Sequence, residues 1–328
     1  MITRRELLRS SASAALASPL VARTGFAQDT SWPAKEVRAI AMFPAGSGAD
    51  IYVRFFAKKL GDEIGKTVIV ENKPGAFGNI ANEYVARSKP DGYTIYIAPT
   101  NLLTIAPALY KKLNYDPLKD YDSACTLFKL PFILNVAADG PYKSVADLVA
   151  AMKKKGDKGS YGSVSTVSLI SAELFKVQFG LETVEVKYKE SANAMNDLLS
   201  GTLDFAFIDP AGTAALRNSG KLRALAVTTK DRVSSLPNIP GAHEVGIMNS
   251  DVFSWWSIHT PKGTPKPILD KLEVAGLKIV KDADTREFLG KTGSDPFPGD
   301  AALARKLLED GVKIWGDWVK LAKVEQMG

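Results

Sequence analysis

Small polar residues crowd the stretch "FPAGSGAD", residues 43–50, which lies between an apolar run and a helix-like run. Glycines let a ligand approach the backbone, and a serine hydroxyl can donate or accept a hydrogen bond. A helix N-terminus adds free N–H groups and the positive end of a dipole. The stretch therefore predicts an anion site that needs no lysine or arginine.

Five further loops share this composition, and most of them run directly into a predicted helix. They are "KPGAFGN" (73–79), "APTNLLT" (98–104), "GSVSTVS" (162–168), "YKESANA" (188–194) and "IDPAGTA" (208–214). Loops that follow parallel strands meet at the carboxyl edge of a sheet, where ligands of open α/β folds bind. Turn formation alone would explain any one loop, but the six together favour a binding site.

The sequence patterns of catalysis are missing from these loops. "AGSGA" is not a G-x-S-x-G elbow, and "FPAGSGAD" lacks both the G-K-[ST] of a P-loop and the third glycine of a dinucleotide fingerprint. His243 and His259 have no triad or metal-ligand spacing, and the single Cys125 is expected to be buried and structural. These features predict binding without catalysis, cofactor or metal. The alternative is an exported serine-dependent hydrolase whose nucleophile is Ser47, Ser163 or Ser165.

The N-terminus predicts export. Residues 1–27 combine a basic start, an Ala/Ser/Leu-rich stretch and a small-x-small site that ends at Ala27, and "TRRELL" resembles the twin-arginine signature. Removal of this segment near Ala27 would leave a periplasmic protein, whereas the alternative is a cytosolic helix. The segment carries four arginines and one glutamate, so the net charge of +6 falls to +3, which argues against nucleic-acid binding.

The rest of the 328 residues is long enough for two lobes, and its strands and helices alternate as in βα units. Strands are expected at 36–43, 67–72, 94–100, 132–138, 159–164, 183–189, 203–209, 222–229 and 251–261. Helices are expected at 50–65, 79–88, 144–156, 168–180, 193–201, 265–280, 283–293 and 300–324, with a short helix between the strands at 203–209 and 222–229. Asp50 is the expected N-cap of its helix, and residues 113–124 are expected to be irregular. This order predicts parallel sheets covered by helices, with the chain crossing to a second lobe near Cys125 and returning near Asp251.

Several long blocks of the chain resemble the Bug proteins, which are periplasmic solute receptors of tripartite tricarboxylate transporters. The blocks are "FPAGSGADIYVRFFAKKL", "VENKPGAFGNIANEYVARSKPDGYTI", "TIAPALYKKLNYDPLKD", "YKESANAMNDLLSGTLDFAF", "SGKLRALAVTTKDR" and "WWSIHTPKGTP". The resemblance implies a type II periplasmic binding protein fold, in which two βα lobes are joined by a hinge and the ligand cleft lies between them. The implied division is a signal peptide at 1–27, lobe one at 28–125 and 251–328, and lobe two at 126–250.

The same resemblance implies a monomeric receptor that closes over a small carboxylate and delivers it to a membrane permease. A receptor that serves a sensor instead of a permease is the alternative within this class. The implied ligand-binding residues lie in the six loops: Phe43, Ala45, Gly46, Ser47, Gly48, Phe77, Gly78, Asn79, Thr100, Asn101, Ser163, Ser165, Thr166, Ser191, Ala192 and Asp209.

Departures from the family pattern bear on the ligand. Phe77 stands where the family usually has a glycine, Glu190 replaces another glycine, and "PTNLLTIAP" lacks a histidine often found there. Phe77 and Trp255 are expected either to flank an aromatic ring or to belong to the core or hinge. Asp209 is expected either to line the pocket or to cap a helix, and Glu190 to point to solvent. An aromatic or dicarboxylic acid is the favoured ligand.

Overall fold

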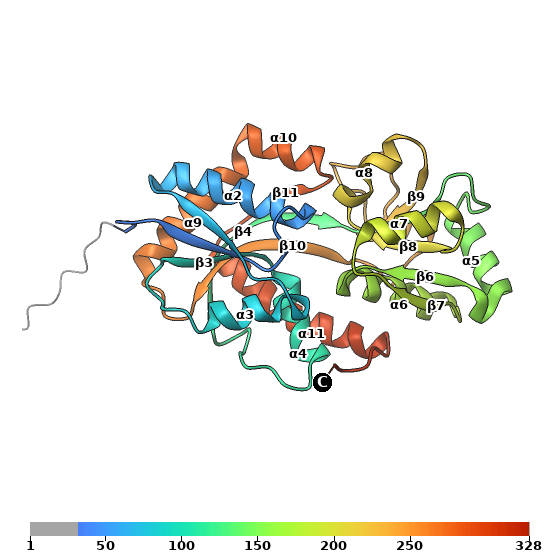
Figure 1. The fold of residues 1–328 in the computed structure, drawn as a ribbon, viewed down its shortest axis with the longest axis horizontal. Coiled ribbons are helices and arrows are strands. Elements are labelled where there is room, and N and C mark those ends of the chain that lie inside the picture. Colours follow the sequence, from blue (N-terminus) through green and yellow to red (C-terminus); the bar gives the residue numbers. More distant parts are fainter. Residues whose placement is uncertain (1–31, 328) are drawn as a thin grey trace, which may run out of the picture. The chain divides into compact units, whose positions relative to one another are not determined.

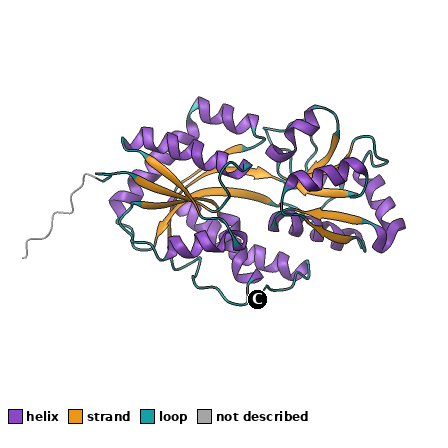
Figure 2. Ribbon diagram, viewed as in Figure 1, coloured by secondary structure: helices purple, strands orange, loops and turns teal. Residues whose placement is uncertain are grey.

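Two mixed β-sheets with helices packed against them form the fold (Figures 1 and 2). The computed structural model describes residues 32–327. The first sheet has the strand order β11 (Asp295–Gly299), β4 (Tyr121–Pro131), β10 (Phe253–Pro261), β3 (Thr94–Pro99), β1 (Val37–Ala41) and β2 (Val68–Asn72). The second has the order β7 (Val184–Lys187), β6 (Ser160–Ser163), β8 (Phe205–Ile208), β5 (Ile133–Ala137) and β9 (Leu222–Val227).

The helices divide between the two sheets (Figure 1). With the first sheet lie α2 (Gly48–Ile64), α3 (Asn79–Ala86), α4 (Thr100–Leu109), α9 (Lys266–Lys281), α10 (Ala283–Lys291) and α11 (Ala301–Leu321). With the second lie α5 (Val145–Lys155), α6 (Thr166–Phe179), α7 (Ser191–Ser200) and α8 (Pro210–Asn218). The chain therefore places its C-terminal helices beside its N-terminal strands.

The prediction of parallel sheets is right for only part of each sheet. Strand β1 pairs in parallel with β2 and β3, and β6 pairs in parallel with β7 and β8, but β10 is antiparallel to β3 and β4 and β5 is antiparallel to β8 and β9. Each of β5 and β10 is the first strand after the chain passes from one sheet to the other. Each consequently enters its new sheet from the opposite end.

Among the α-helices and strands of residues 32–327, three escaped prediction: α4, β4 and β11. Helix α4 begins inside a polar loop and contains Pro107, which weakens the helical signal. Strand β4 begins within the segment predicted to be irregular, and its polar residues Ser123 and Thr126 are buried. Ser123 hydrogen-bonds to the His259 ring and Thr126 donates to the Phe297 carbonyl. Partners distant in sequence make this strand possible, so its local pattern cannot reveal it.

No helix within residues 32–327 is long and apolar enough to cross a bilayer. The predicted export signal at 1–27 lies outside the described residues.

Gly311 sets how closely α11 approaches α4. A Cβ atom at Gly311 would lie 2.8 Å from Thr104 Cγ2 and 3.1 Å from Trp255 Cη2, whereas a Cβ at Gly316 in the same helix would meet nothing within 4 Å. We expect Gly311→Ala to lower the free energy of unfolding by about 1–3 kcal/mol through overpacking. Gly316→Ala should raise it by about 0.5–1 kcal/mol through helix propensity. Urea unfolding of both variants tests the contrast, and equal effects would refute the close-packing argument.

Candidate functional site

The N-cap of helix α2, at the end of the first loop, differs from the one predicted. Ser47, not Asp50, is the N-cap: the Ser47 hydroxyl accepts a hydrogen bond from the Asp50 backbone N–H at 3.3 Å, and Asp50 lies in the first helical turn. Serine needs extended backbone angles at this position, and Ser47 has φ −69° and ψ 160°. Ala45, Gly46 and Gly48 are exposed at this end of the helix.

The buried Asp50 carboxylate organises the first loop. It accepts hydrogen bonds from Gly46 N–H at 2.8 Å, Asn72 Nδ2 at 2.7 Å and Arg54 Nε at 2.7 Å. Burial alone would raise the pKa of the Asp50 carboxyl, but these hydrogen bonds and the Arg54 charge outweigh it and hold the pKa below its ordinary value. The Gly46 N–H is therefore already used, and the first N–H groups of α2, at Gly48 and Ala49, are the ones free of an intrahelical partner.

The second loop is strained. Gly75, Ala76, Phe77 and Gly78 all have positive φ, and Ala76 and Phe77 do so without being glycine, at 45° and 49°. The Tyr110 hydroxyl donates to the Ala76 carbonyl at 3.0 Å. Backbone strain of this kind is concentrated at functional sites.

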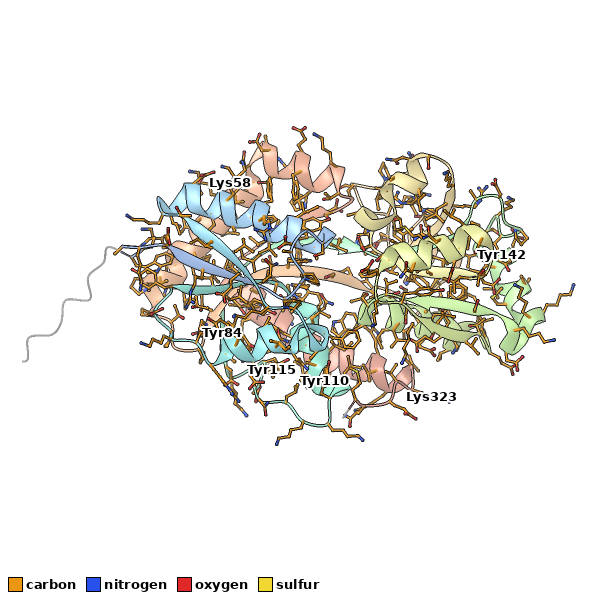
Figure 3. The ribbon with its side chains drawn as sticks, viewed as in Figure 1. Lys58, Tyr84, Tyr110, Tyr115, Tyr142 and Lys323 are labelled. Carbon is orange, nitrogen blue, oxygen red and sulfur yellow. The ribbon has the colours of Figure 1, made fainter. Side chains whose placement is uncertain are left out.

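Two tyrosines from beyond α4 support this second loop (Figure 3). Tyr110 holds the Ala76 carbonyl, and the Tyr115 hydroxyl donates to Asn79 Oδ1 at 2.7 Å. The Asn79 oxygen is thereby occupied, which leaves the amide nitrogen of this side chain to meet a ligand. Helix α3 starts at Asn79 without a side-chain cap. The Asn79 N–H donates to the Ala76 carbonyl, whereas the next N–H groups, at Ile80 and Ala81, have no carbonyl of the same helix to bind.

The buried His259 holds the third loop in place through Thr100. Thr100 and Asn101 are fully buried, and their side chains face the protein interior: Thr100 Oγ1 lies 2.9 Å from Ser257 Oγ and 3.0 Å from His259 Nε2, and Asn101 accepts from Ser254. Helix α4 begins at Thr100 without a side-chain cap. The side-chain oxygens of both residues are committed, and because both residues are buried, their contact with a ligand stays a prediction.

In the second sheet, the loop after β6 presents Ser163, Ser165 and Thr166. Ser165 is the N-cap of α6 and accepts from Ser168 N–H at 3.2 Å, so its own proton remains available. Ser163 donates its proton to Glu185 Oε1 at 2.5 Å. Ser165 can thus donate a hydrogen bond to a ligand, whereas Ser163 can only accept one. The sequence pattern does not distinguish these two serines.

The other two loops of the second sheet contrast with each other. Glu190 is exposed, as predicted, and helix α7 begins at Ser191, two residues before its predicted start. The helix has no side-chain cap, so the N–H groups of Ser191 and Ala192 are open. Helix α8 is capped by Asp209, which accepts from Gly212 N–H at 2.8 Å. Burial raises the pKa of the Asp209 carboxyl, and the backbone hydrogen bonds only partly offset this.

Aromatic residues lie under the first loop. Phe43 stacks on Trp256, with ring centroids 5.7 Å apart, and Trp256 stacks on Phe128 at 5.1 Å. Trp255 is buried beside Gly311 and Phe253, which places it in the core, one of the two roles expected for it. Trp256 was missed, because "WW" in a strand does not tell which ring turns toward the loop.

One cavity of about 660 Å³ brings four of the predicted residues together. Phe77 comes from the second loop of the first sheet, and Ser163, Ser165 and Thr166 from the start of α6. Phe77 is 60% exposed, so its ring is available at the cavity wall. The remaining predicted residues are not among those that line this cavity, and their role in binding stays a prediction.

The serine-hydrolase alternative finds no geometry to support it. The Ser163 hydroxyl donates a hydrogen bond to Glu185, and the Ser47 hydroxyl caps α2. His259 is buried and hydrogen-bonds to Ser123 and Thr100. Burial also raises the pKa of the Cys125 thiol to about 12, so this residue is not an activated nucleophile. Within residues 32–327, no group of three His, Cys, Asp or Glu side chains could hold a metal ion.

The His259 anchor predicts a pH dependence of stability. Burial lowers the pKa of His259 to about 3, whereas in the unfolded chain it is about 6.5. Between these values the unfolded chain binds a proton that the folded chain excludes, so stability is complete above about pH 6.5 and is lost as the pH falls. His259→Gln should flatten the plot of unfolding free energy against pH between 6.5 and 4, by up to about 1.4 kcal/mol per pH unit. Ser123→Ala keeps the imidazole and should keep the slope; an unchanged slope in His259→Gln would contradict the assignment.

Comparisons with known proteins agree with this arrangement. A family model described as the tripartite tricarboxylate transporter family receptor matches residues 52–323. A relative from Agrobacterium vitis, named UPF0065 protein in the TAR-I ttuE-ttuC' intergenic region, is 32% identical over 300 residues, which cover 91% of this chain and 85% of the relative.

Solved structures extend the similarity to the fold. The structure titled R. palustris Rpa4515 with adipate has a TM-score of 0.82 at 28% identity, covering 90% of this chain and 100% of that one. The periplasmic binding protein BugD has a TM-score of 0.80 at 30% identity, with the same coverage. The predicted two-lobed periplasmic binding fold, the resemblance to Bug proteins and the preference for a receptor over an enzyme are thus confirmed. The chain belongs to the tripartite tricarboxylate transporter receptor family.

Proposed function

We propose that this chain is a periplasmic receptor that captures a small carboxylate by closure of two lobes and delivers it to a membrane permease of the tripartite tricarboxylate type. The observation that carries the proposal is the exposed N-terminus of α7, which has no side-chain cap, together with the open first N–H groups of α2. The N-termini of α3 and α4, which also lack side-chain caps, are further candidates. These donors bind an anion through the backbone and the helix dipole.

The proposed division follows the two sheets. Lobe one comprises residues 28–125 and 251–328, and lobe two comprises 126–250, with the hinge where the chain passes between the sheets. A ligand that touches both lobes would favour the closed arrangement by its difference in affinity for the closed and open states. We further infer an export signal at 1–27 and a monomeric receptor. A sensor partner in place of a permease is the second candidate for the final step.

The favoured ligand is an aromatic or dicarboxylic acid. A similar solved structure holds adipate, a dicarboxylate. The exposed Phe77 ring offers apolar surface for the body of a ligand, and the half-buried Phe43 ring, which stacks on the buried Trp256, is a second candidate. The proposed contacts to the carboxylate are the backbone N–H groups of loops one to three and the Ser165 hydroxyl, and Gly46 would shape its loop through Asp50 instead of binding directly.

A thermal-shift panel tests the proposed function. We expect carboxylates, and not neutral sugars of similar size, to raise the melting temperature, and to raise it further with the logarithm of ligand concentration. Mono-, di- and tricarboxylates, aromatic acids and acidic amino acids form the panel, with calorimetry on each acid that stabilises the protein. Stabilisation by a sugar and by no carboxylate would overturn the proposal, and recovery of a chemically altered ligand would point to an enzyme.

Phe77→Gly tests the aromatic wall. We expect this variant to weaken binding of an aromatic acid by about threefold to tenfold more than binding of an aliphatic acid, because ring stacking contributes about 0.5–1.5 kcal/mol. Ala76→Gly is the matched control: it removes the same positive-φ strain one residue away but leaves the ring in place. Equal losses for both acids in Phe77→Gly, or the same pattern in Ala76→Gly, would contradict a role for the ring.

A further inference from the structure

We propose that Glu185 determines specificity by turning Ser163 into a hydrogen-bond acceptor, so that the ligand is a carboxylic acid that also carries a hydroxyl or ammonium group. This inference rests on the proposed function and adds to it a residue that lies outside the six loops. Glu185 is on β7, the edge strand next to β6, which ends at Ser163.

The geometry fixes the direction of the hydrogen bond. Ser163 Oγ lies 2.5 Å from Glu185 Oε1, and both residues line the same cavity. A serine hydroxyl has one proton and two lone pairs, and a carboxylate can only accept. The single proton of Ser163 is therefore directed to Glu185, and only lone pairs of its oxygen remain for a ligand.

The surroundings keep this arrangement in place. The Ser163 side chain is almost wholly buried, and the Glu185 side chain is 22% exposed. The ammonium that approaches Glu185 belongs to Lys187, 3.6 Å away and 80% exposed, so water screens much of that pair. The charge of Glu185 is thus only partly offset at the cavity wall.

A second acidic side chain on this wall is already paired. Glu173 accepts from the Tyr161 hydroxyl and from Lys176 Nζ, which lies 2.9 Å away. Lys176 is consequently engaged, and it does not stand free to receive a second ligand carboxylate next to Ser163. A carboxylate placed against Ser163 would meet lone pairs and the charge of Glu185, whereas a hydroxyl or ammonium would donate to Ser163.

The neighbouring Ser165 can donate a hydrogen bond to the ligand carboxylate. Its hydroxyl proton is free and α6 begins at Thr166, so this part of the cavity can bind a carboxylate two residues from the acceptor at Ser163. Donor and acceptor positions side by side fit an acid whose hydroxyl or amino group lies close to a carboxylate.

Matched acids that differ by one donor group provide the test. The pairs are succinate with malate, adipate with 2-aminoadipate, and phenylacetate with mandelate, each measured by calorimetry on the full-length mature protein. We expect at least one pair to bind, and the donor-bearing member of each binding pair to bind about tenfold more tightly, as one hydrogen bond to a charged group allows.

Three variants assign the preference to its source. Glu185→Ala releases the Ser163 proton and should reduce the preference to less than about threefold. Ser163→Ala should do the same without removing a charge. Glu182→Ala removes the same charge three residues away, outside the residues that line the cavity, and should retain the wild-type preference.

The outcomes separate the two proposals. Equal or weaker binding of the donor-bearing acids by the wild type, or an unchanged preference in both Glu185→Ala and Ser163→Ala, would overturn the role of Glu185 while the carboxylate receptor stands. Loss of the preference in Glu182→Ala as well would attribute it to overall charge and would also overturn it. Failure of every acid to bind would refute the proposed function itself.

Discussion

The backbone N–H groups at the helix N-termini are the constraint on which the candidate site depends. Each helix begins with N–H groups that no carbonyl of the same helix can satisfy. At α8 the carboxylate of Asp209 fills this need, and at α2 Asp50 binds the N–H of Gly46 just before the helix. At α3, α4 and α7 no side chain caps the helix. Helices α9 and α10 also begin without a side-chain cap, so an uncapped N-terminus offers N–H groups to an anion but does not by itself locate the site.

Buried polar side chains hold these helix N-termini in position. Asp50 ties the first loop to Asn72 on β2, Tyr115 ties Asn79 to the segment beyond α4, and His259 on β10 carries Thr100. Each hydrogen bond joins residues from different elements and is partly or wholly buried, so a lost partner would leave a poorly satisfied polar group. A preorganised set of donors needs this support, because ordering a mobile loop on binding would cost conformational entropy and weaken the affinity.

The side chains that line the cavity add discrimination to this anion site. Phe77 presents a ring from a backbone that is itself strained, whereas Ser163 and Ser165 present opposite hydrogen-bonding capacity within three residues. A site built from backbone donors alone would accept many carboxylates. The body of the ligand, and the groups attached to it, would therefore be recognised by side chains of this wall.

The sequence by itself determined the alternation of strands and helices, the six small-residue loops and the family, because these depend on local periodicity and composition. Even there it placed the α2 cap three residues late, since Asp50 and Ser47 both suit the position. Only the tertiary structure decided the direction of β5 and β10, the burial of Thr100 and Asn101, and the partners of Asp50, Ser163 and His259. The pairs Asp50 with Asn72, Ser163 with Glu185 and Thr100 with His259 lie 22 to 159 residues apart in the chain, and the tertiary fold, not local sequence, brings them within hydrogen-bonding distance.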